Sequence, residues 1–225
     1  MAETVEGVCQ CTAVQRITKE TQVMWFFRCS NTNGITKNVT IAGPVSQYPD
    51  EEIAKLAAIS QCERWVAHCL DADTLVKMTD GSKQPISSLK PGDQILSTTD
   101  GQDVFVDTIT SVDVSKHDAT LTVPIAAGEN LVASSTQPIL SSKGMISVAS
   151  LVTDKQADIK FGTNQSESMR VASDGIEPTF HEAPVDLYSL ATERSEYFFV
   201  SESELIVKCK GPCGGDPPGP GGICR

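Results

Sequence analysis

One segment of the sequence constrains the fold more than any other, and it begins at Cys69. A short apolar stretch follows at residues 74–78, and the dipeptide Asp80-Gly81 after it favours a tight hairpin turn. A further apolar stretch is preceded by the turn sequence Pro91-Gly92-Asp93. This succession of short strands and tight turns predicts a compact β-fold with the thiol of Cys69 at its mouth.

Short apolar stretches separated by Gly or Asp recur from Cys69 to about Cys209, which predicts a mainly β domain over residues 68–209. The expected strands are residues 74–78, 94–97, 104–112, 119–123, 130–133, 184–191, 197–200 and 204–207. No helical period longer than a few turns occurs in this region. Residues 153–182 are polar and interrupted by Gly and Pro, so we expect a loop or insertion there.

Residues 1–67 predict a small α+β domain with the order β-β-β-α. Stretches 8–17, 23–29 and 35–41 have strand character, and the turn sequence Asn31-Thr-Asn-Gly34 joins the last two. Pro49 and the acidic residues after it favour the start of a helix over residues 50–66. The residues expected to share the buried face of this helix are Ile53, Leu56, Ala57 and Ser60. Nothing in this domain forms a catalytic set.

Composition and charge narrow the possible partners and the location. The formal net charge is −11, which argues against nucleic acid and anionic membranes as partners. No apolar run is long enough to span a bilayer, and the first residues lack the pattern of a signal peptide, so we expect a soluble, cytoplasmic chain. Residues 210–225 are too rich in Gly and Pro to pack a core, and we expect a disordered tail there.

Three segments together resemble the Hint family, which comprises inteins and the autoprocessing domain of hedgehog proteins: the opening at Cys69, residues 130–145, and the closing stretch 187–207. The resemblance spans about residues 69–209 and implies a horseshoe-shaped β-fold. It also implies self-cleavage, in which Cys69 attacks the carbonyl of His68 and converts the peptide bond into a thioester by an N-to-S acyl shift. The substrate would be the chain's own N-terminal segment, with water, a thiol or an amine completing cleavage, and no cofactor or metal is implied.

The sequence departs from the family's central motif at two positions, where Ser134 stands for a Thr and Gln137 for a His. Serine keeps the hydroxyl, but the family's His protonates the leaving nitrogen, and a carboxamide has no proton to give near neutral pH. General acid catalysis contributes about 10²- to 10⁴-fold, so we expect slow cleavage, or cleavage assisted by another group. The imidazoles available for this are His68, His117 and His181. Gln137 could still donate a hydrogen bond that polarises the bond between His68 and Cys69.

Further residues complete the expected site and leave alternatives open. Asp113 falls where hedgehog-type members place a catalytic aspartate, and it is the candidate for orienting or deprotonating Cys69. The family's closing strand returns beside its first residue, so Cys209 could accept the acyl group or form a disulfide with Cys69. Val207 is followed by Lys208 and Cys209 with no Asn to cyclise, so full splicing is not expected. Hedgehog-type members need a sterol-recognition segment after the Hint core, and here the Gly- and Pro-rich residues 210–225 follow, so sterol transfer is not expected either.

Two interpretations other than self-cleavage remain. The first is a degenerate Hint fold that no longer reacts and acts as a binding or scaffold module. The second is a zinc-dependent module built on Cys9, Cys11, Cys29 and Cys62, although the spacing of these cysteines is looser than in usual zinc sites and favours simple buried cysteines.

Overall fold

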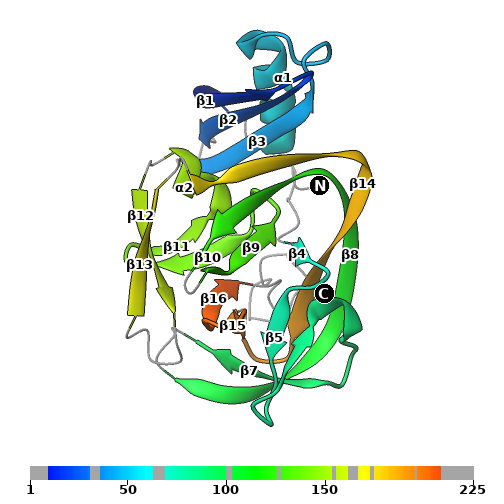
Figure 1. Ribbon diagram of the computed structural model, residues 1–225, viewed down its shortest axis with the longest axis vertical. Coiled ribbons are helices and arrows are strands. Elements are labelled where there is room, and N and C mark those ends of the chain that lie inside the picture. Colours follow the sequence, from blue (N-terminus) through cyan, green and yellow to red (C-terminus); the bar gives the residue numbers. More distant parts are fainter. Residues whose placement is uncertain are drawn as a thin grey trace, which may run out of the picture.

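The computed structural model describes residues 10–30, 36–62, 69–99, 103–125, 128–153, 156–161, 167–172, 175–195 and 197–208. They form two sheets of very different size. A three-stranded sheet covered by one helix lies at one end of the molecule, and a 13-stranded sheet makes up the rest (Figure 1). The chain enters the small sheet first and reaches the large one at Cys69.

The small sheet consists of β1 (Gln10–Lys19), β2 (Gln22–Ser30) and β3 (Thr36–Pro44), antiparallel in that order, followed by α1 (Glu51–Cys62). The predicted β-β-β-α order is therefore confirmed. On the predicted face of the helix, Ala57 packs against the core, the side chain of Ser60 lies outside the described residues, and the prediction is wrong for Ile53 and Leu56. Ala54 and Ala58 are buried, whereas Ile53 and Leu56 are 43% and 65% exposed. The reason is the size of the sheet residues, because Trp25 and Phe27 fill the space under α1 and leave room only for small side chains.

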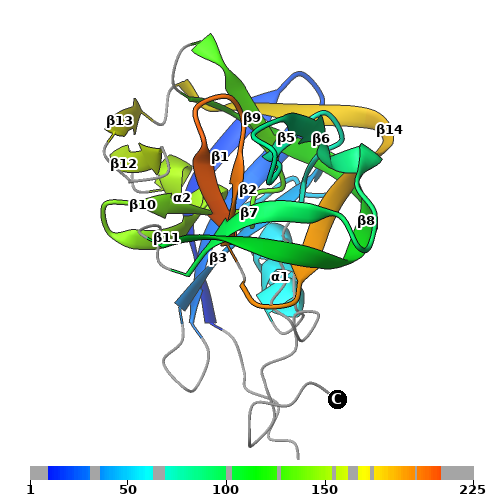
Figure 2. The same ribbon diagram turned by 90° about the horizontal axis from the view of Figure 1, so that it is seen from below.

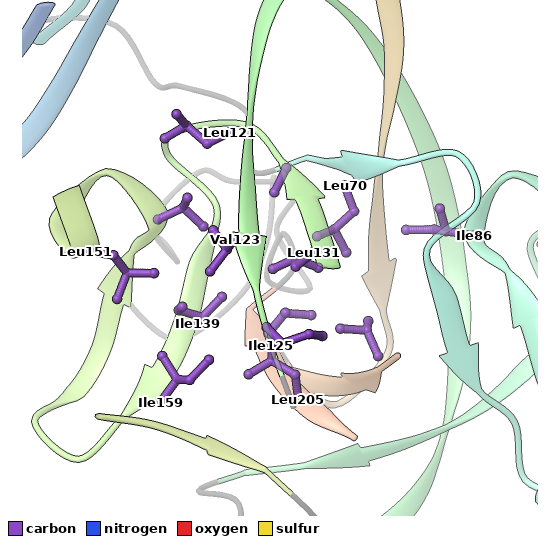
Figure 3. Packing of buried hydrophobic residues seen from close by; sticks show 14 of the residues in the cluster. Leu70, Ile86, Leu121, Val123, Ile125, Leu131, Ile139, Leu151, Ile159 and Leu205 are labelled. Atoms are coloured by element: carbon purple, nitrogen blue, oxygen red, sulfur yellow. The ribbon is translucent and has the colours of Figure 1, made fainter. Parts of the chain in front are cut away.

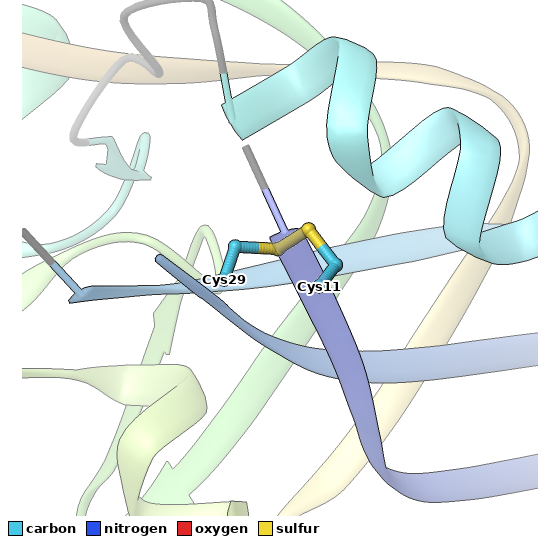
Figure 4. The surroundings of a disulfide bond; sticks show 2 residues. All are labelled: Cys11 and Cys29. Carbon is cyan, nitrogen blue, oxygen red and sulfur yellow. A yellow bond between two sulfur atoms is a disulfide. The ribbon is translucent and has the colours of Figure 1, made fainter. Parts of the chain in front are cut away.

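A disulfide joins two strands of the small sheet. Cys11 of β1 and Cys29 of β2 stand directly opposite each other in the register, and their sulfur atoms are bonded (Figure 4). The sequence left simple buried cysteines and a zinc site as the alternatives for these residues. Both are wrong for Cys11 and Cys29, because the register of β1 and β2 places them opposite each other and they form a disulfide. Cys9 and the side chain of Cys62 lie outside the described residues.

The large sheet is built mainly from short strands, with two exceptionally long ones. Its strands are β4 (Leu70–Asp71), β5 (Leu75–Lys77), β6 (Lys83–Pro85), β7 (Gln94–Thr98), β8 (Val104–Pro124), β9 (Asn130–Ala133), β10 (Pro138–Ser141), β11 (Gly144–Ser147), β12 (Gln156–Phe161), β13 (Glu167–Ala172), β14 (Glu177–Thr192), β15 (Tyr197–Val200) and β16 (Leu205–Lys208). A 3₁₀ turn at Ile86–Ser88 and the short helix α2 (Val148–Thr153) complete it. The long strands β8 and β14 pair with each other and curve around one side of the molecule (Figure 1).

Most predicted strands of this region are confirmed within one or two residues, and two expectations are wrong. Residues 104–112 and 119–123 belong to the single strand β8, because β14 pairs with it on both sides of the polar residues between them. Residues 153–182 are not a loop, since they contain β12, β13 and the start of β14. In β12 the buried Ile159 and Phe161 alternate with the half-buried Lys160, so two apolar residues are enough to anchor a polar strand.

The predicted turns of the opening segment form as expected. Gly81 and Gly92 both have the positive φ that favours glycine, at 85° and 95°. The Asp80 carboxylate accepts hydrogen bonds from the hydroxyl and the N–H of Ser82, and these bonds hold the pKa of Asp80 below its usual value. Asp80 thus stabilises the hairpin turn locally.

Four strands of the large sheet close into a ring. β8 pairs with both β14 and β9, and β4 bridges these two, because Leu70 lies opposite Tyr188 of β14 and Ala133 of β9. Leu70 and Leu131 point into the apolar core beside this ring (Figure 3). The closure brings residues that are far apart in the sequence to the N-terminal end of β4.

The small sheet packs against the large one through its face opposite α1. Met24 and Phe26 of β2 belong to the same buried cluster as the core of the large sheet. Asn38 of β3 donates a hydrogen bond of 2.6 Å to the hydroxyl of Ser150 in α2. Seen from below, β2 and β3 lie behind the large sheet (Figure 2). The N-terminal unit is therefore attached by an apolar contact as well as by the chain.

Candidate active site around Cys69

Cys69 lies directly before β4 and is almost completely enclosed. Its exposed fraction is 1%, and its sulfur is not part of a disulfide among the described residues. Its carbonyl accepts a hydrogen bond of 2.9 Å from the N–H of Ser134, next to the pairing of Leu70 with Ala133. The backbone of Cys69 is thereby fixed to the end of β9. His68 lies outside the described residues.

The amide nitrogen of Cys69 is held by a hydroxyl group. Its N–H donates a hydrogen bond of 3.2 Å to Oγ of Ser134, which is itself 3.2 Å from Oγ1 of Thr136. Ser134 is buried, so these hydrogen bonds are shielded from bulk water. This nitrogen is the one that would leave if the bond between His68 and Cys69 were cleaved. The predicted site residue Ser134 is therefore in direct contact with Cys69.

A second pair of side chains approaches the thiol from β8. The sulfur of Cys69 lies 3.1 Å from Oγ of Ser115, and Oγ of Ser115 lies 2.9 Å from Nε2 of His117. Along this part of β8, Ser115 and His117 are half-buried while Lys116 and Asp118 are exposed. The two-residue period of a strand therefore points Ser115 and His117 to the same face.

The environment of His117 favours its neutral form. Burial lowers the pKa of His117 below the ordinary value of 6.5, and the nearby Asp118 carboxylate opposes this effect in part. At neutral pH the imidazole is therefore uncharged and carries one ring nitrogen with a free lone pair. With the tautomer that protonates Nδ1, Nε2 can accept a proton from Ser115.

Gln137 lies close to Ser134 in the chain but contacts a different part of the site. Its side-chain Nε2 donates hydrogen bonds to the carbonyls of Pro138, at 3.0 Å, and of Lys208, at 2.9 Å. A carboxamide nitrogen has two hydrogens, so both are used by these two carbonyls. Gln137 thus binds the last described residue of β16, and the turn from Ser134 to Gln137 contacts both the residue before β4 and the end of β16, the first and last strands of the large sheet in the chain. Cys209 itself lies outside the described residues.

The other predicted residues lie on the β8–β14 pair. Asp113 precedes Ser115 by two residues, on the same face of β8, and stands opposite Ser189 in the register. His181 lies beyond an irregularity in the pairing, with Nε2 3.1 Å from Oγ1 of Thr120. Of the two histidines in the described residues, His117 is therefore the one linked through Ser115 to Cys69.

Sequence analysis missed Ser115, although part of the signal was present. Ser115 and His117 are separated by one residue within a strand, which places them on one face. What the sequence could not reveal is that this face meets Cys69.

In the parts of the chain that the structure describes, no group of three or more His, Cys, Asp or Glu side chains could hold a metal ion. No helix among these residues is long and apolar enough to cross a membrane.

Comparison with solved structures identifies the architecture. The chain is similar to the bacterial intein-like domain from Clostridium thermocellum, with a TM-score of 0.56, 16% identity, and coverage of 64% of this chain and 99% of that domain. It is also similar to the mini-intein variant M86 of Ssp DnaB, with a TM-score of 0.50, 14% identity, and coverage of 64% and 95%. The chain has an intein-like Hint fold. Comparisons with protein-family profiles and with curated protein sequences give no match.

Proposed function

We propose that this protein is a self-cleaving, intein-like protein whose nucleophile is Cys69. The thiolate of Cys69 attacks the carbonyl carbon of His68, a carbon–sulfur bond forms, and the bond from that carbon to the nitrogen of Cys69 breaks. The nitrogen gains the proton that the thiol lost, so the N-to-S acyl shift is balanced. Water, an outside thiol or an amine then cleaves the thioester and separates residues 1–68 from residues 69–225.

A single arrangement carries this proposal: Cys69 is held at both of its reacting atoms. Ser134 binds the amide nitrogen that must leave, at 3.2 Å, and Ser115 lies 3.1 Å from the sulfur that must attack. A cysteine with a merely structural role needs neither contact, since a buried thiol behaves as a small apolar group. Holding a nucleophile beside the bond it attacks is a large source of rate enhancement.

The proposal does not extend to splicing or sterol transfer. The segment after Val207 offers no Asn that could cyclise, and Gln137 holds the carbonyl of Lys208 by a hydrogen bond. Acyl transfer from Cys69 to Cys209, and the function of Asp113 in orienting the thiol, stay predictions. The outside nucleophile is likewise defined only by its chemistry.

The alternative function is a Hint fold that has lost its reaction and acts as a binding or scaffold module. The observation that favours it is the engagement of Gln137, whose two side-chain hydrogens are used by main-chain carbonyls and which has no titratable proton. The apolar contact of Met24 and Phe26 with the larger unit would suit such a module equally well.

The cytoplasmic location expected from the sequence stays a prediction, and one observation weighs against it. Disulfides persist mainly in oxidising compartments, and Cys11 is bonded to Cys29. Cell fractionation followed by alkylation of free thiols before and after reduction would test the location and the disulfide together.

The test of self-cleavage is the intact mass of the purified full chain, measured under denaturing conditions with and without hydroxylamine. Denaturing conditions are needed because Met24 and Phe26 pack into the larger unit, so cut fragments can stay together. Hydroxylamine is preferred to dithiothreitol because a thiol reagent would also reduce the bond between Cys11 and Cys29. We expect two fragments that meet between His68 and Cys69.

Two variants make this test specific. In Cys69→Ala the fragments should be absent, because the nucleophile is removed. In Cys209→Ala they should persist if an outside nucleophile resolves the thioester, and should diminish if Cys209 accepts the acyl group. A single species of 24.1 kDa under every condition would reject self-cleavage and leave the binding module.

A further inference from the structure

We propose that Ser115 and His117 form a proton relay that activates the thiol of Cys69. This inference rests on the proposed function of Cys69 as the nucleophile. Ser115 touches the reacting sulfur and is a catalytic residue, whereas His117 acts through Ser115 and is a positioning residue. Neither residue is one that the sequence resemblance assigns to the reaction.

The distances define a continuous path for one proton. The sulfur of Cys69 is 3.1 Å from Oγ of Ser115, and that oxygen is 2.9 Å from Nε2 of His117. In the relay the S–H bond breaks as its proton moves to Oγ, and the original hydroxyl proton of Ser115 moves to Nε2. The products are a thiolate and an imidazolium, so charge is conserved. When the C–N bond breaks, the nitrogen of Cys69 gains one proton, which balances the one held at His117.

A free thiol needs such help at neutral pH. Its pKa is about 8.5, so only a few per cent is present as thiolate at pH 7. A base with a pKa near the working pH is the most effective proton acceptor, and histidine meets this condition. Burial lowers the pKa of His117, so its acceptor form persists to below pH 6.5.

Several charged residues lie near His117, but the direct contact between its imidazole and the sulfur of Cys69 runs through Ser115. Lys116 and Asp118 are its exposed neighbours on β8, and Asp186 of β14 forms an ion pair of 2.7 Å with Lys116. The residue opposite His117 on β14 is the uncharged Val185, and Asp113 lies on the same face of β8 as His117. Asp118 raises the pKa of His117 without cancelling the effect of burial.

The experiment measures hydroxylamine-dependent cleavage of the full chain between pH 5 and 8 for the unmodified protein, Ser115→Ala and His117→Gln. The rate ratio of variant to unmodified protein at each pH cancels the ionisation of hydroxylamine. We expect the rate of the unmodified protein to fall as pH drops through the pKa of His117, because the protonated imidazole cannot accept a proton. Cleavage of His117→Gln should be slower at pH 7 by about 10²-fold, and the fall in rate at acidic pH should be absent from its pH–rate profile.

The matched control is His181→Gln, which removes an imidazole that also contacts a hydroxyl, that of Thr120. It should keep the full rate and the full pH profile. Ser115→Thr retains a hydroxyl and should recover most of the rate that Ser115→Ala loses. The relay is overturned if His117→Gln keeps the pH profile of the unmodified protein.

A second measurement separates failure of the relay from failure of self-cleavage. The rate at which iodoacetamide alkylates Cys69 is followed by peptide mapping over the same pH range, and this rate requires no cleavage. If the chain does not cleave but His117→Gln slows alkylation near neutral pH and shifts its profile to higher pH, the relay stands and the proposed function falls. If alkylation of Cys69 has the same pH profile with and without His117, the relay falls.

Discussion

The two sides of Cys69 differ in the proton-transfer groups that they offer. On the thiol side, Ser115 leads to the imidazole of His117, whose neutral form is favoured by burial. On the amide side, the nitrogen meets the hydroxyl of Ser134, and the adjacent Gln137 uses its two side-chain hydrogens on carbonyls. The thiol is therefore linked to a base, His117, whereas no titratable acid contacts the leaving nitrogen among the described side chains.

This asymmetry indicates which step of the proposed reaction limits its rate. Attack by the thiol is assisted, but expulsion of an amide nitrogen needs a proton to reach that nitrogen. A hydroxyl can orient the nitrogen and pass a proton along, but it is too weak an acid to supply one near neutral pH. We therefore expect breakdown of the tetrahedral intermediate to be slower than its formation. An acid added on the amide side should then raise the rate, whereas removing groups from that side should have smaller effects.

The largest of these effects is expected from Gln137→His, which adds a titratable group on the amide side. If protonation of the leaving nitrogen limits the rate, an imidazole there should accelerate hydroxylamine-dependent cleavage by about 10²-fold or more. The acceleration should be greatest at mildly acidic pH, where the added imidazole is protonated. The measurement is the rate of fragment formation by denaturing intact mass.

The matched control for this gain is Gln137→Asn. It keeps a carboxamide on a shorter side chain and introduces no titratable proton, so no acceleration is expected. An unchanged rate in Gln137→His, in a chain that still cleaves, would show that a missing acid is not what limits the reaction. The contrast between the two sides of Cys69 would then have no kinetic meaning.

Much of the fold could be predicted because its strands carry local signals. The turns at Asp80-Gly81 and Pro91-Gly92-Asp93 were recognisable from residue types that favour a single turn geometry. The strands β9 and β15 were predicted with their observed limits. Predictions failed where contacts between residues far apart in the sequence determine the local structure. Strand β12 is stabilised by pairing with β13, and the buried face of α1 is determined by the aromatic residues of β2.

The residues of the candidate site show the same difference between local signals and distant contacts. Cys69 and Ser134 were predicted because each belongs to a short motif, and the structure brings them into contact. Ser115 was not predicted, because it meets Cys69 only after β8, β14, β4 and β9 close into a ring. No local pattern encodes that closure. His117 was one of three equivalent imidazoles in the sequence, and its neighbour Ser115 is what distinguishes it in the structure.

A smaller effect is expected from Ser134→Ala, which removes the hydroxyl that binds the leaving nitrogen. One hydrogen bond contributes about 0.5–1.5 kcal/mol, which corresponds to at most about tenfold in rate. We expect cleavage about tenfold slower than in the unmodified protein. Ser134→Thr keeps the hydroxyl and should keep most of the rate. If Ser134→Ala abolished cleavage as completely as Cys69→Ala, Ser134 would be a proton donor and the amide side would not lack an acid.

The smallest effect on rate, and the clearest effect on stability, is expected from Gln137→Ala. Gln137 binds the carbonyls of Pro138 and Lys208, so Gln137→Ala removes two hydrogen bonds. One hydrogen bond contributes about 0.5–1.5 kcal/mol, and we expect the free energy of unfolding to fall by about 1–3 kcal/mol. Denaturant unfolding in a Cys69→Ala background measures this without interference from cleavage. The rate of cleavage, measured with Cys69 present, should stay near that of the unmodified protein, because neither carbonyl belongs to the bond that breaks. A large loss of rate with unchanged stability would instead mean that the carboxamide acts on the reaction, and that the amide side is better equipped than its hydrogen bonds indicate.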